Sequence, residues 1–599
     1  MEPFEQIIEL YETRHREAAA AGEALERRSA RISLLRLVLF MAAAGCAIAA
    51  FAVASISFWW TGMLLLAFLA AAVAHDQVIR RLEKVGWIRA HYEDGLFRLR
   101  EQWAGRGNTR TDFVARDHLY AADLDIFGEG SLFDLLCTAR TRSGESQLAA
   151  WISGPSATQD ILARQDAVQE LRDNVMLRED IHVCAMRMRS LVNPEKLMSW
   201  AAAPSPVAAS AARGYRIGFA LLALLASAAV ASCFFLPFGL GILAGVVVVQ
   251  WVVGRICRRW IDPVVAGVDG PRAQLTVLSC ILERFEQLDV KGPLLQELKA
   301  ALMDGGRASL RVAGLGRLVD RLDWSKNQFF APFAFLLMWR GHGALALETW
   351  RHENGSRIGP WLDAAGRLEA LCSLAGFAFE HPDYAFPTMT EGSPRMAGRA
   401  VGHPLLPRSS CVRNDVQLGD GLQVHIVSGS NMSGKSTWLR TIGINAVLAM
   451  AGAPVCAESL SMTPFAIGST IRILDSLQKG TSRFYAEIRT LKEIVELSKG
   501  SCPLLFLLDE IFHGTNSHDR RIGAEAIIRE LVRAGAVGLV TTHDLALAKM
   551  VDTMDGRGRN VHFEDSVEEG LLHFDYRLKD GPVTRSNAIE LMRSVGLHV

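Results

Sequence analysis

The sequence predicts a largely helical chain with two membrane-spanning helical hairpins, followed by a C-terminal α/β domain. Three observations support this fold class. Residues 37–74 and 217–254 carry no charged side chain over 38 residues each. Helical periodicity dominates most of the remaining chain up to about residue 390. From about Ala400, short β-branched or apolar runs alternate with helical segments, which is typical of an α/β sheet domain.

Composition narrows the classes of function. The 599 residues include 64 Lys and Arg and 64 Asp and Glu, so the formal net charge is zero. This balance excludes a basic surface over the whole protein, of the kind that binds nucleic acid strongly and non-specifically. It is compatible with local basic patches. Half of the residues are hydrophobic, too many for a disordered chain, and the length predicts several domains. The ten cysteines are scattered without a CxxC pair, so we expect reduced packing residues and no disulfide framework.

Each uncharged stretch is too long for a single membrane pass. A 38-residue helix would be about 57 Å long, nearly twice a hydrocarbon core of about 30 Å. The first stretch is predicted to turn near Ser55 to Ser57, and the second at Leu236 to Gly239, where Pro lacks an N–H and Gly relaxes the backbone. The expected spans are 37–54, 58–74, 217–235 and 240–256. Buried hairpins of a soluble core are the alternative, but such helices rarely stay apolar on every side.

Flanking charge predicts the orientation of the spans. Basic residues lie at the ends of both stretches, within 27–36, 80–84, 213–216 and 255–259, whereas the hairpin tips are uncharged. We therefore expect a multi-pass protein with four transmembrane helices in a lipid bilayer, with both termini and the bulk of the chain in the cytoplasm. The charge-rich residues before the first stretch argue against a cleaved signal peptide.

These patterns divide the chain into seven segments. We expect a cytoplasmic amphipathic helix in 1–36, the first transmembrane hairpin in 37–74, a juxtamembrane linker in 75–111, the first part of a core domain in 112–212, the second transmembrane hairpin in 217–256, a helical arm or second part of the core in 262–390 and the α/β domain in 395–599. For 1–36, a helix that simply continues the first span is an equal alternative.

A phosphate-binding loop opens the α/β domain. The segment GSNMSGKST follows the strand-like run Val424 to Val427 and precedes a helical pattern. In such a loop backbone N–H groups and the helix N-terminus face phosphate oxygens, Lys435 reaches the β and γ phosphates, and Ser436 ligates Mg²⁺. The expected ATP-binding residues of this loop are Gly429, Ser430, Asn431, Met432, Ser433, Gly434, Lys435, Ser436 and Thr437.

Two later strand ends carry further candidates. Asp509 and Glu510 follow the apolar run Leu504 to Leu508, and His543 follows the run Val537 to Thr541. A carboxylate at a strand end can hold the Mg²⁺ shell, and a second one can polarise the attacking water. We therefore expect Asp509 to belong to the Mg²⁺ coordination shell, Glu510 to act as catalytic base, and His543 to contact the γ phosphate. Taken singly, an acidic pair or a histidine at such a place is compatible with a purely structural role.

These motifs resemble those of the MutS family of ABC-type ATPases. The phosphate loop is similar to the family's GPNMGGKST, and LLDEIFHGTNSHD (507–519) resembles its LLDElGRGTSTxD. The similarity covers about 112–200 and 360–599, and further matching segments are GTSRFYAE (480–487), GHPLL (402–406), SLFDLLCTARTRSGESQLAAWI (131–152) and ARQDAVQEL (163–171).

The resemblance implies an ABC-type ATPase that hydrolyses ATP with Mg²⁺ in composite sites of a homodimer. In that arrangement Ser482 would contact the nucleotide held by the opposite subunit. Asp519 would lie in the loop that couples the two sites, and His403 would line the nucleotide pocket. Cys411 stands where the family often has an aromatic residue that stacks on adenine, which weakens base selectivity there.

The sequence also departs from the family. DNA-reading members carry an N-terminal mismatch-binding domain with an F-x-E motif, whereas Phe4-Glu5-Gln6 does not match it. The second uncharged stretch falls within the region of the arms and the DNA clamp. Mismatch recognition is therefore not expected.

These observations are compatible with three functions. The leading hypothesis is a membrane-anchored ATPase that couples ATP hydrolysis to movement of helical arms, together with an unknown protein partner. The alternative is a membrane-tethered, DNA-binding ATPase of DNA repair or recombination, aided by cations such as Arg140 and Arg142. An ABC transporter half fits less well, because the chain has no LSGGQ-like signature and no ionisable residue within its apolar stretches.

Overall fold

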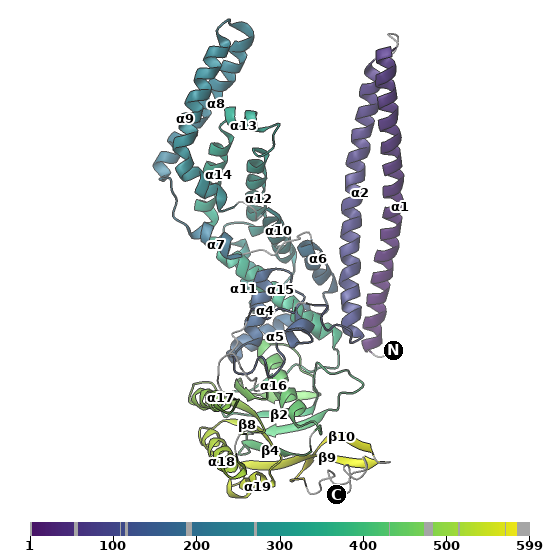
Figure 1. The fold of residues 1–599 in the computed structure, drawn as a ribbon, viewed down its shortest axis with the longest axis vertical. Helices are drawn as coiled ribbons and strands as arrows, with labels where there is room; N and C mark the ends of the chain where they lie inside the picture. The colour runs from purple at the N-terminus through teal and green to yellow at the C-terminus, as the bar shows by residue number, and fades with distance from the viewer. Residues whose placement is uncertain are drawn as a thin grey trace.

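The molecule is elongated, with the α/β domain at one end and two long helical hairpins extending from the other (Figure 1). The computed structural model describes residues 3–52, 58–107, 109–113, 118–186, 194–268, 272–430, 432–472, 483–512, 516–568 and 571–583. A helical body lies between the α/β domain and the second hairpin, and the first hairpin runs beside this body (Figure 1). The helical N-terminal region and the mixed α/β C-terminal part match the predicted fold class.

The first hairpin consists of α1 (Pro3–Ala52) and α2 (Phe58–Leu99), which lie side by side. Because α1 is continuous, residues 1–36 do not form a separate helix, and the alternative of a helix that continues the span is correct for the described residues. The linker expected in 75–111 is wrong over most of its length, because α2 continues to Leu99. No proline interrupts α2, and its Leu, Ala, Arg and Glu residues favour the helix. The turn predicted at Ser55 to Ser57 lies outside the described residues.

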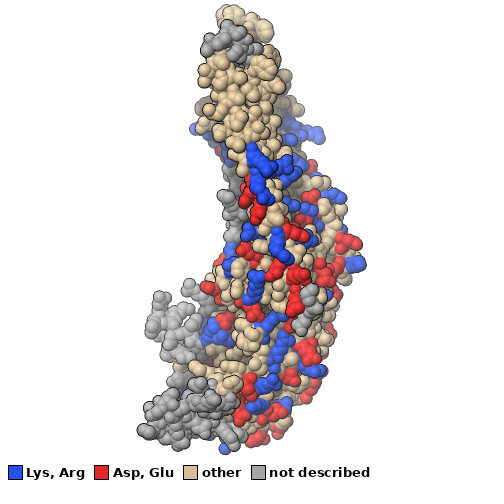
Figure 2. Space-filling model, turned by 90° about the vertical axis from the view of Figure 1, so that its right-hand side faces the viewer, with Lys and Arg blue, Asp and Glu red and all other residues tan. Residues whose placement is uncertain are grey.

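The second hairpin consists of α8 (Ala209–Phe235) and α9 (Gly239–Ala266), with the predicted break at Leu236 to Phe238. Within the described part of the chain, four helices are long and apolar enough to cross a membrane: α1, α2, α8 and α9. Their most apolar windows are at most 17% buried inside the protein. Figure 2 shows that the upper end of the molecule lacks Lys, Arg, Asp and Glu, while both signs of charge are mixed over the rest of that face.

The body that connects the second hairpin to the α/β domain is helical, as predicted. Helix α15 is buried along most of its length and packs against α4, α5 and α11. The helices of the body are α3 (Leu132–Leu136), α4 (Arg142–Ile152), α5 (Thr158–Arg172), α6 (Val175–Met186), α7 (Pro194–Ala202), α10 (Arg272–Gln287), α11 (Pro293–Met303), α12 (Ala308–Trp324), α13 (Ala331–Leu336), α14 (Trp339–Asn354), the short 3₁₀ helix η1 (Gly355–Arg357) and α15 (Ile358–Glu380).

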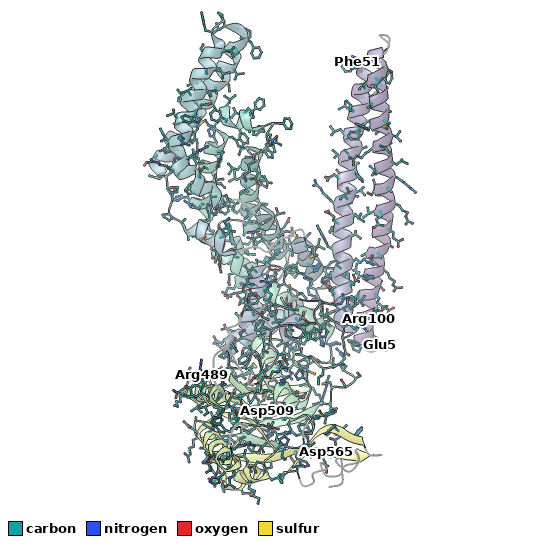
Figure 3. All side chains as sticks on the ribbon, in the orientation of Figure 1. Glu5, Phe51, Arg100, Arg489, Asp509 and Asp565 are labelled. Atoms are coloured by element: carbon teal, nitrogen blue, oxygen red, sulfur yellow. A yellow bond between two sulfur atoms is a disulfide. The ribbon has the colours of Figure 1, made fainter. Side chains whose placement is uncertain are left out.

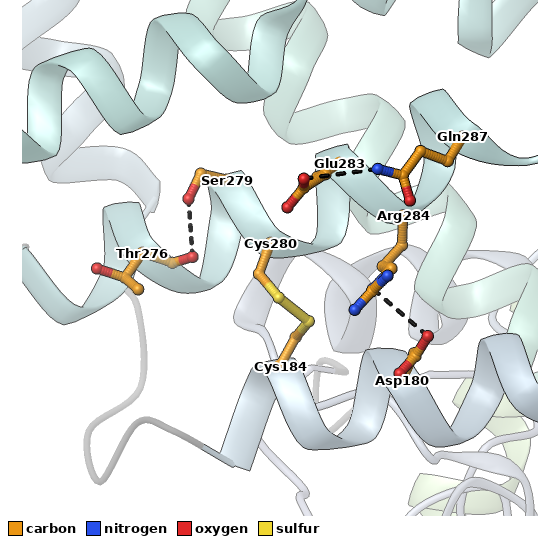
Figure 4. The surroundings of a disulfide bond; sticks show 8 residues. All are labelled: Asp180, Cys184, Thr276, Ser279, Cys280, Glu283, Arg284 and Gln287. Atoms are coloured by element: carbon orange, nitrogen blue, oxygen red, sulfur yellow. Dashed lines mark hydrogen bonds and ion pairs between the residues drawn. A yellow bond between two sulfur atoms is a disulfide. The ribbon is translucent and has the colours of Figure 1, made fainter. Parts of the chain in front are cut away.

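A disulfide crosslinks two helices of the body. Cys184 of α6 is bonded to Cys280 of α10, with their Cα atoms 5.9 Å apart, and Arg284 pairs with Asp180 one turn further along (Figure 4). The expectation that all ten cysteines are reduced is therefore wrong for this pair. The two cysteines are 96 positions apart, and only the packing of α6 on α10 brings them within disulfide range.

The α/β domain contains a mostly parallel sheet. Six described strands run in the order β10-β9-β4-β8-β7-β6, all parallel except the β9/β10 pair. These strands are β4 (Val424–Ser428), β6 (Ala466–Thr470), β7 (Leu504–Asp509), β8 (Val537–Thr542), β9 (Gly558–Glu568) and β10 (Leu571–Asp580). A smaller sheet of the described residues has the order β1-β5-β2-β3, from β1 (Thr388–Met389), β2 (Met396–Val401), β3 (Asn414–Leu418) and β5 (Ser459–Met462). The three strand-like runs of the sequence are thus strands β4, β7 and β8.

Helices cover both faces of the larger sheet. Leu505 and Leu507 of β7 face the core that contains α16 (Lys435–Ala451), whereas Phe506 and Leu508 face the opposite core. This alternation follows from the two-residue period of a strand. The second core is closed by α17 (Arg483–Leu497), α18 (Ser517–Arg533), α19 (Leu545–Ala548) and the 3₁₀ helix η3 (Lys549–Thr553). Because α16 faces the helical body, movement at its N-terminus can reach the body directly.

The base of the first hairpin docks where the body meets the α/β domain. Arg98 of α2 donates two hydrogen bonds to the buried Glu380 carboxylate, at 2.8 and 2.7 Å. The hydroxyl of Tyr11 in α1 donates to the same carboxylate at 3.3 Å. Figure 3 shows Glu5 and Arg100 at this base and Phe51 at the far end of the hairpin. Since Glu380 ends α15, one side chain ties both helices of the hairpin to the body.

Glu380→Gln should loosen this base. Neutralising Glu380 leaves the buried Arg98 guanidinium without its counter-charge, which costs on the order of 3–5 kcal/mol in buried pairs. We expect a lower thermal unfolding midpoint in detergent and faster hydrogen exchange around Leu96 to Leu99. The matched control is Glu12→Gln, since Glu12 forms an exposed pair with Arg100 in the same hairpin, worth at most about 1 kcal/mol. Equal effects of the two variants would contradict the role of Glu380.

Candidate active site

The phosphate-binding loop connects β4 to α16. Gly434 precedes α16 with a left-handed φ of 103°, and Met432 also has a positive φ, of 68°. The hydroxyl of Ser433 donates to the carbonyl of Ser430 at 2.9 Å and braces the turn. The Ser430 hydroxyl is shielded from solvent and has no hydrogen-bond partner among the described residues. Asn431 lies outside those residues.

Lys435 begins α16 with its side chain buried. Its ammonium donates to the carbonyl of Gly429 at 3.0 Å and to that of Ser430 at 2.9 Å. It also lies 3.4 Å from Oε1 of Glu510. Burial lowers the pKa of Lys435, although the charges of Glu510 and Asp509 oppose that shift. The carbonyl groups of the loop therefore hold the Lys435 ammonium at the turn of the loop backbone.

The two carboxylates sit at the end of β7. The Thr541 hydroxyl donates to Oδ1 of Asp509 and accepts a hydrogen bond from the backbone N–H of Glu510 at 3.0 Å. Thr541 can do so because β7 and β8 are parallel and pair Asp509 with Thr541. Glu510 has a left-handed φ of 47°, a costly conformation for a residue with a Cβ. Figure 3 places Asp509 within the α/β domain.

His543 completes a three-residue cluster. Its Nε2 lies 2.5 Å from Oε1 of Glu510 and 3.2 Å from Nζ of Lys435. The three side chains follow β8, β7 and β4, whose carboxyl ends meet at one edge of the sheet. Ligands of open parallel sheets bind at this edge. The cluster thus places a cation that can bind phosphate, Lys435, 3.4 Å from a carboxylate that can accept a proton, Glu510.

Two other predicted residues, His403 and Asp519, make no hydrogen bond or ion pair with this cluster among the contacts of the described residues. His403 is buried, and burial together with the charge of Arg440 lowers its pKa to about 4, so it is neutral at physiological pH. Its backbone N–H donates to the sulfur of Cys411 at 3.3 Å. Asp519 is exposed in the first turn of α18, where its backbone N–H donates to Asn516 at 2.8 Å. Ser482 lies outside the described residues.

Sequence reasoning missed Tyr576 and Asn414, which lie beside the phosphate loop. Tyr576 lies against the phosphate loop, since a Cβ on Gly434 would meet its ring at 3.1 Å. Asn414 holds Tyr576 there by donating to its carbonyl at 2.9 Å, from 162 positions away, so no local pattern could reveal it. Glu487 is buried and accepts a hydrogen bond from the backbone N–H of Phe512. Glu487 ends the segment GTSRFYAE (480–487), on which the family resemblance partly rests.

The phosphate-loop helix also contacts the helical body. Arg440, in the second turn of α16, pairs with Asp125 at 3.1 Å, and Arg472 pairs with the same carboxylate at 2.6 Å. Next to it, Asp123 accepts hydrogen bonds from the Ser469 hydroxyl at 2.6 Å and the backbone N–H of Arg472 at 2.9 Å. These two aspartates join the body to the edge strand β6 and to the helix that starts at Lys435.

The donor set at the site suits a hard cation. Ser436 is the second residue of α16 and Asp509 ends β7, and both side chains carry oxygen atoms. No group of three or more His, Cys, Asp and Glu side chains gathers as a metal cage in the described part of the chain. A few protein oxygens combined with phosphate and water oxygens are what Mg²⁺ prefers, so the residues present fit that ion.

Comparison with known proteins assigns two parts of the chain. Residues 118–321 match the model of MutS domain III, and residues 425–598 match that of MutS domain V. Among curated relatives, the chain is 35% identical over 217 residues to "Endonuclease MutS2" of Thermomicrobium roseum, covering 35% of this chain and 26% of the relative. It is 34% identical over 241 residues to "DNA mismatch repair protein MutS" of Shouchella clausii, covering 39% and 27%. The chain thus spans about a quarter of these relatives' length, and two parts of it match the models of MutS domains III and V.

Proposed function

We propose that this chain is a membrane-anchored, MutS-like ATPase that binds and hydrolyses ATP and couples the cycle to movement of its helical arms. The observation that carries the proposal is the meeting of Lys435, Glu510 and His543 beside the phosphate loop. The match to MutS domain V supports it, because members of that family are ATPases that use ATP with Mg²⁺.

Each residue of the cluster has a role that its position supports. Lys435 binds the β and γ phosphates, and the backbone N–H groups of 429–437 bind phosphate oxygens. Ser436 and Asp509 hold Mg²⁺, which when bound neutralises the charge on the phosphates. Glu510 accepts the proton of the attacking water. His543, 2.5 Å from Glu510, positions that carboxylate and contacts the γ phosphate.

Glu510→Gln should bind ATP but hydrolyse it slowly. The amide keeps the shape of the carboxylate and cannot accept the proton, and loss of a general base costs roughly 10²–10⁴-fold in rate. We expect kcat to fall by that range while the ATP dissociation constant changes little. Glu530→Gln is the control, since Glu530 is an exposed carboxylate on α18. Unchanged turnover in Glu510→Gln would remove the assignment.

Membrane anchoring rests on the two hairpins. Supporting it, the most apolar windows of α1, α2, α8 and α9 are between 6% and 17% buried by protein, and the described residues at the upper end of Figure 2 show no Lys, Arg, Asp or Glu. Such a surface is stable in contact with acyl chains and not with water. We place both termini and the ATPase domain in the cytoplasm, as the basic flanks favour.

The ATPase domain is proposed to act on the hairpins through two charged contacts. Arg440 transmits movement of the phosphate-loop helix to Asp125 in the helical body. Where the body meets the α/β domain, Glu380 holds Arg98 of the first hairpin. We further propose a homodimer with composite sites, in which His403 lines the nucleotide pocket, Ser482 reaches the partner's nucleotide and Asp519 lies in the coupling loop. The family resemblance supports these last roles.

Asp125→Asn should weaken the coupling. The substitution removes the charge that holds both Arg440 and Arg472, whereas the phosphate loop itself is untouched. We expect ATP binding to persist while the ATP-dependent change in hydrogen exchange at the base of α2 becomes smaller. Asp173→Asn is the control, because Asp173 forms an exposed pair with Arg172 in the same body. A full ATP response in Asp125→Asn would exclude this route.

A membrane-tethered DNA-binding ATPase is the second candidate. Relatives named as DNA mismatch repair proteins and as an endonuclease favour it. Against it, the two arginines considered for this role already pair with carboxylates. Arg140 lies 3.2 Å from Asp94, and Arg142 lies 2.7 Å from Asp112.

DNA binding by the detergent-purified protein separates the two candidates. We expect no binding to duplex, branched or single-stranded DNA by fluorescence anisotropy, even near 50 mM salt. A site that neutralises several phosphates would instead bind tightly and lose about 10³–10⁵-fold in affinity between 50 and 200 mM salt. Such a salt-dependent signal on any of the three DNA forms would favour the tethered DNA-binding alternative.

A further inference from the structure

An apolar segment connects α12 to α14 at the upper end of the helical body. Residues 327–339, NQFFAPFAFLLMW, contain no charged side chain and include α13. Their large side chains are not packed away: Phe329 is 89% exposed, Phe333 61% and Phe335 40%. A soluble surface rarely presents so many adjacent aromatic and aliphatic side chains to water.

The segment lies alongside the second hairpin, at the depth of its uncharged stretch. Gln250 of α9 is fully buried, and its amide donates to the carbonyl of Leu336 at 2.8 Å and to that of Leu222 in α8 at 3.1 Å. Gln250 is eleven residues from Gly239, where α9 begins, so it lies about 16 Å from the tip of the hairpin. Figure 1 shows α13 beside α8 and α9. The carbonyl of Leu336 therefore lies within the apolar zone of the hairpin.

Charges and tryptophans border the segment on the cytoplasmic side. Arg340 follows it and pairs with Asp262 of α9 at 3.1 Å, while Lys326 precedes it and pairs with Asp323 at 2.9 Å. Trp324 is exposed, and Trp339 donates from its indole N–H to the carbonyl of Arg321 at 2.7 Å. An apolar zone ending in tryptophans and then in charges has the order of a membrane interface.

The length and the backbone of the segment suit shallow insertion. Thirteen residues are too few to span a hydrocarbon core of about 30 Å, and apolar runs of this length lie in a protein core or at a membrane interface. Exposure of the phenylalanines excludes the protein core. Met338, with a left-handed φ of 48°, turns the chain back into α14. Internal hydrogen bonds, such as Leu337 N–H to the carbonyl of Phe333 at 2.9 Å, satisfy the backbone, as a lipid environment requires.

We propose that residues 327–339 insert into the cytoplasmic leaflet of the phospholipid bilayer, next to the second hairpin, and bind acyl chains through Phe329, Phe333 and Phe335. The inference rests on the proposed membrane anchoring and extends it, because the lipid contact then belongs to the helical arm itself. Helices α12 and α14, which pack on each other and flank the segment, would press on or lift from the leaflet when the arm moves.

Photocrosslinking of the full chain tests this contact. The photoreactive residue p-benzoylphenylalanine replaces Phe333 in one variant, Leu224 of α8 in a second, and Tyr485 of α17 in a third. All three positions are similarly exposed, at 61%, 66% and 61%. Each variant is placed in phosphatidylcholine nanodiscs whose lipid carries a radiolabelled acyl chain, illuminated, and analysed for labelled protein. We expect labelling at 333 comparable to that at 224, and several-fold above that at 485.

The other outcomes separate the inference from the function on which it rests. Labelling at 224 without labelling at 333 would overturn the insertion of 327–339 and leave membrane anchoring intact. A protein–protein adduct at 333 in place of a lipid adduct would overturn it in favour of a second copy of the chain. Absence of labelling at 224 would overturn anchoring by the second hairpin, and the inference with it.

Discussion

The buried carboxylate of Glu380 is the contact on which the arrangement of the parts depends. It ends α15, a helix buried along most of its length, and it accepts hydrogen bonds from both helices of the first hairpin through Tyr11 and Arg98. Eight residues further along the chain, β1 begins the small sheet of the α/β domain. Arg408 of the C-terminal part donates to the carbonyl of Glu380 at 3.4 Å, so the hairpin, the body and the C-terminal part all contact this residue. Loss of either partner of the buried Glu380–Arg98 pair is costly, because the other is left without its counter-charge.

A second set of charges joins the same body to the phosphate loop. Asp125 holds Arg440 of α16 and Arg472 after β6, so the helix that starts at Lys435 cannot shift without moving or breaking a contact with the body. Within the body, α15 is packed on several helices, and the Cys184–Cys280 disulfide ties α6 to α10. Both charged junctions therefore lie where the body meets the α/β domain, one at α16 and one at the base of the first hairpin.

Local patterns predicted much of this fold. The break at Leu236 to Phe238 and the strands β4, β7 and β8 were predictable, because proline, glycine and runs of apolar residues act over a few neighbouring positions. The division of the first hairpin was predicted less well. A charged segment and an apolar segment can form one continuous helix, because both compositions are compatible with the same helical backbone. Helices α1 and α2 each run from a charged segment into an apolar one, or the reverse, without a break.

By itself, the sequence determined the chemistry available to this protein: a phosphate loop, an acidic pair and a histidine after successive strands, and two uncharged stretches long enough to cross a membrane twice. Only the tertiary structure decided which groups meet. The parallel register of β7 and β8 aligns Asp509 with Thr541, and helix packing brings Cys184 to Cys280, Asp125 to Arg440 and Leu336 to Gln250. Contacts between residues so far apart along the chain depend on how whole elements pack, which no local pattern encodes.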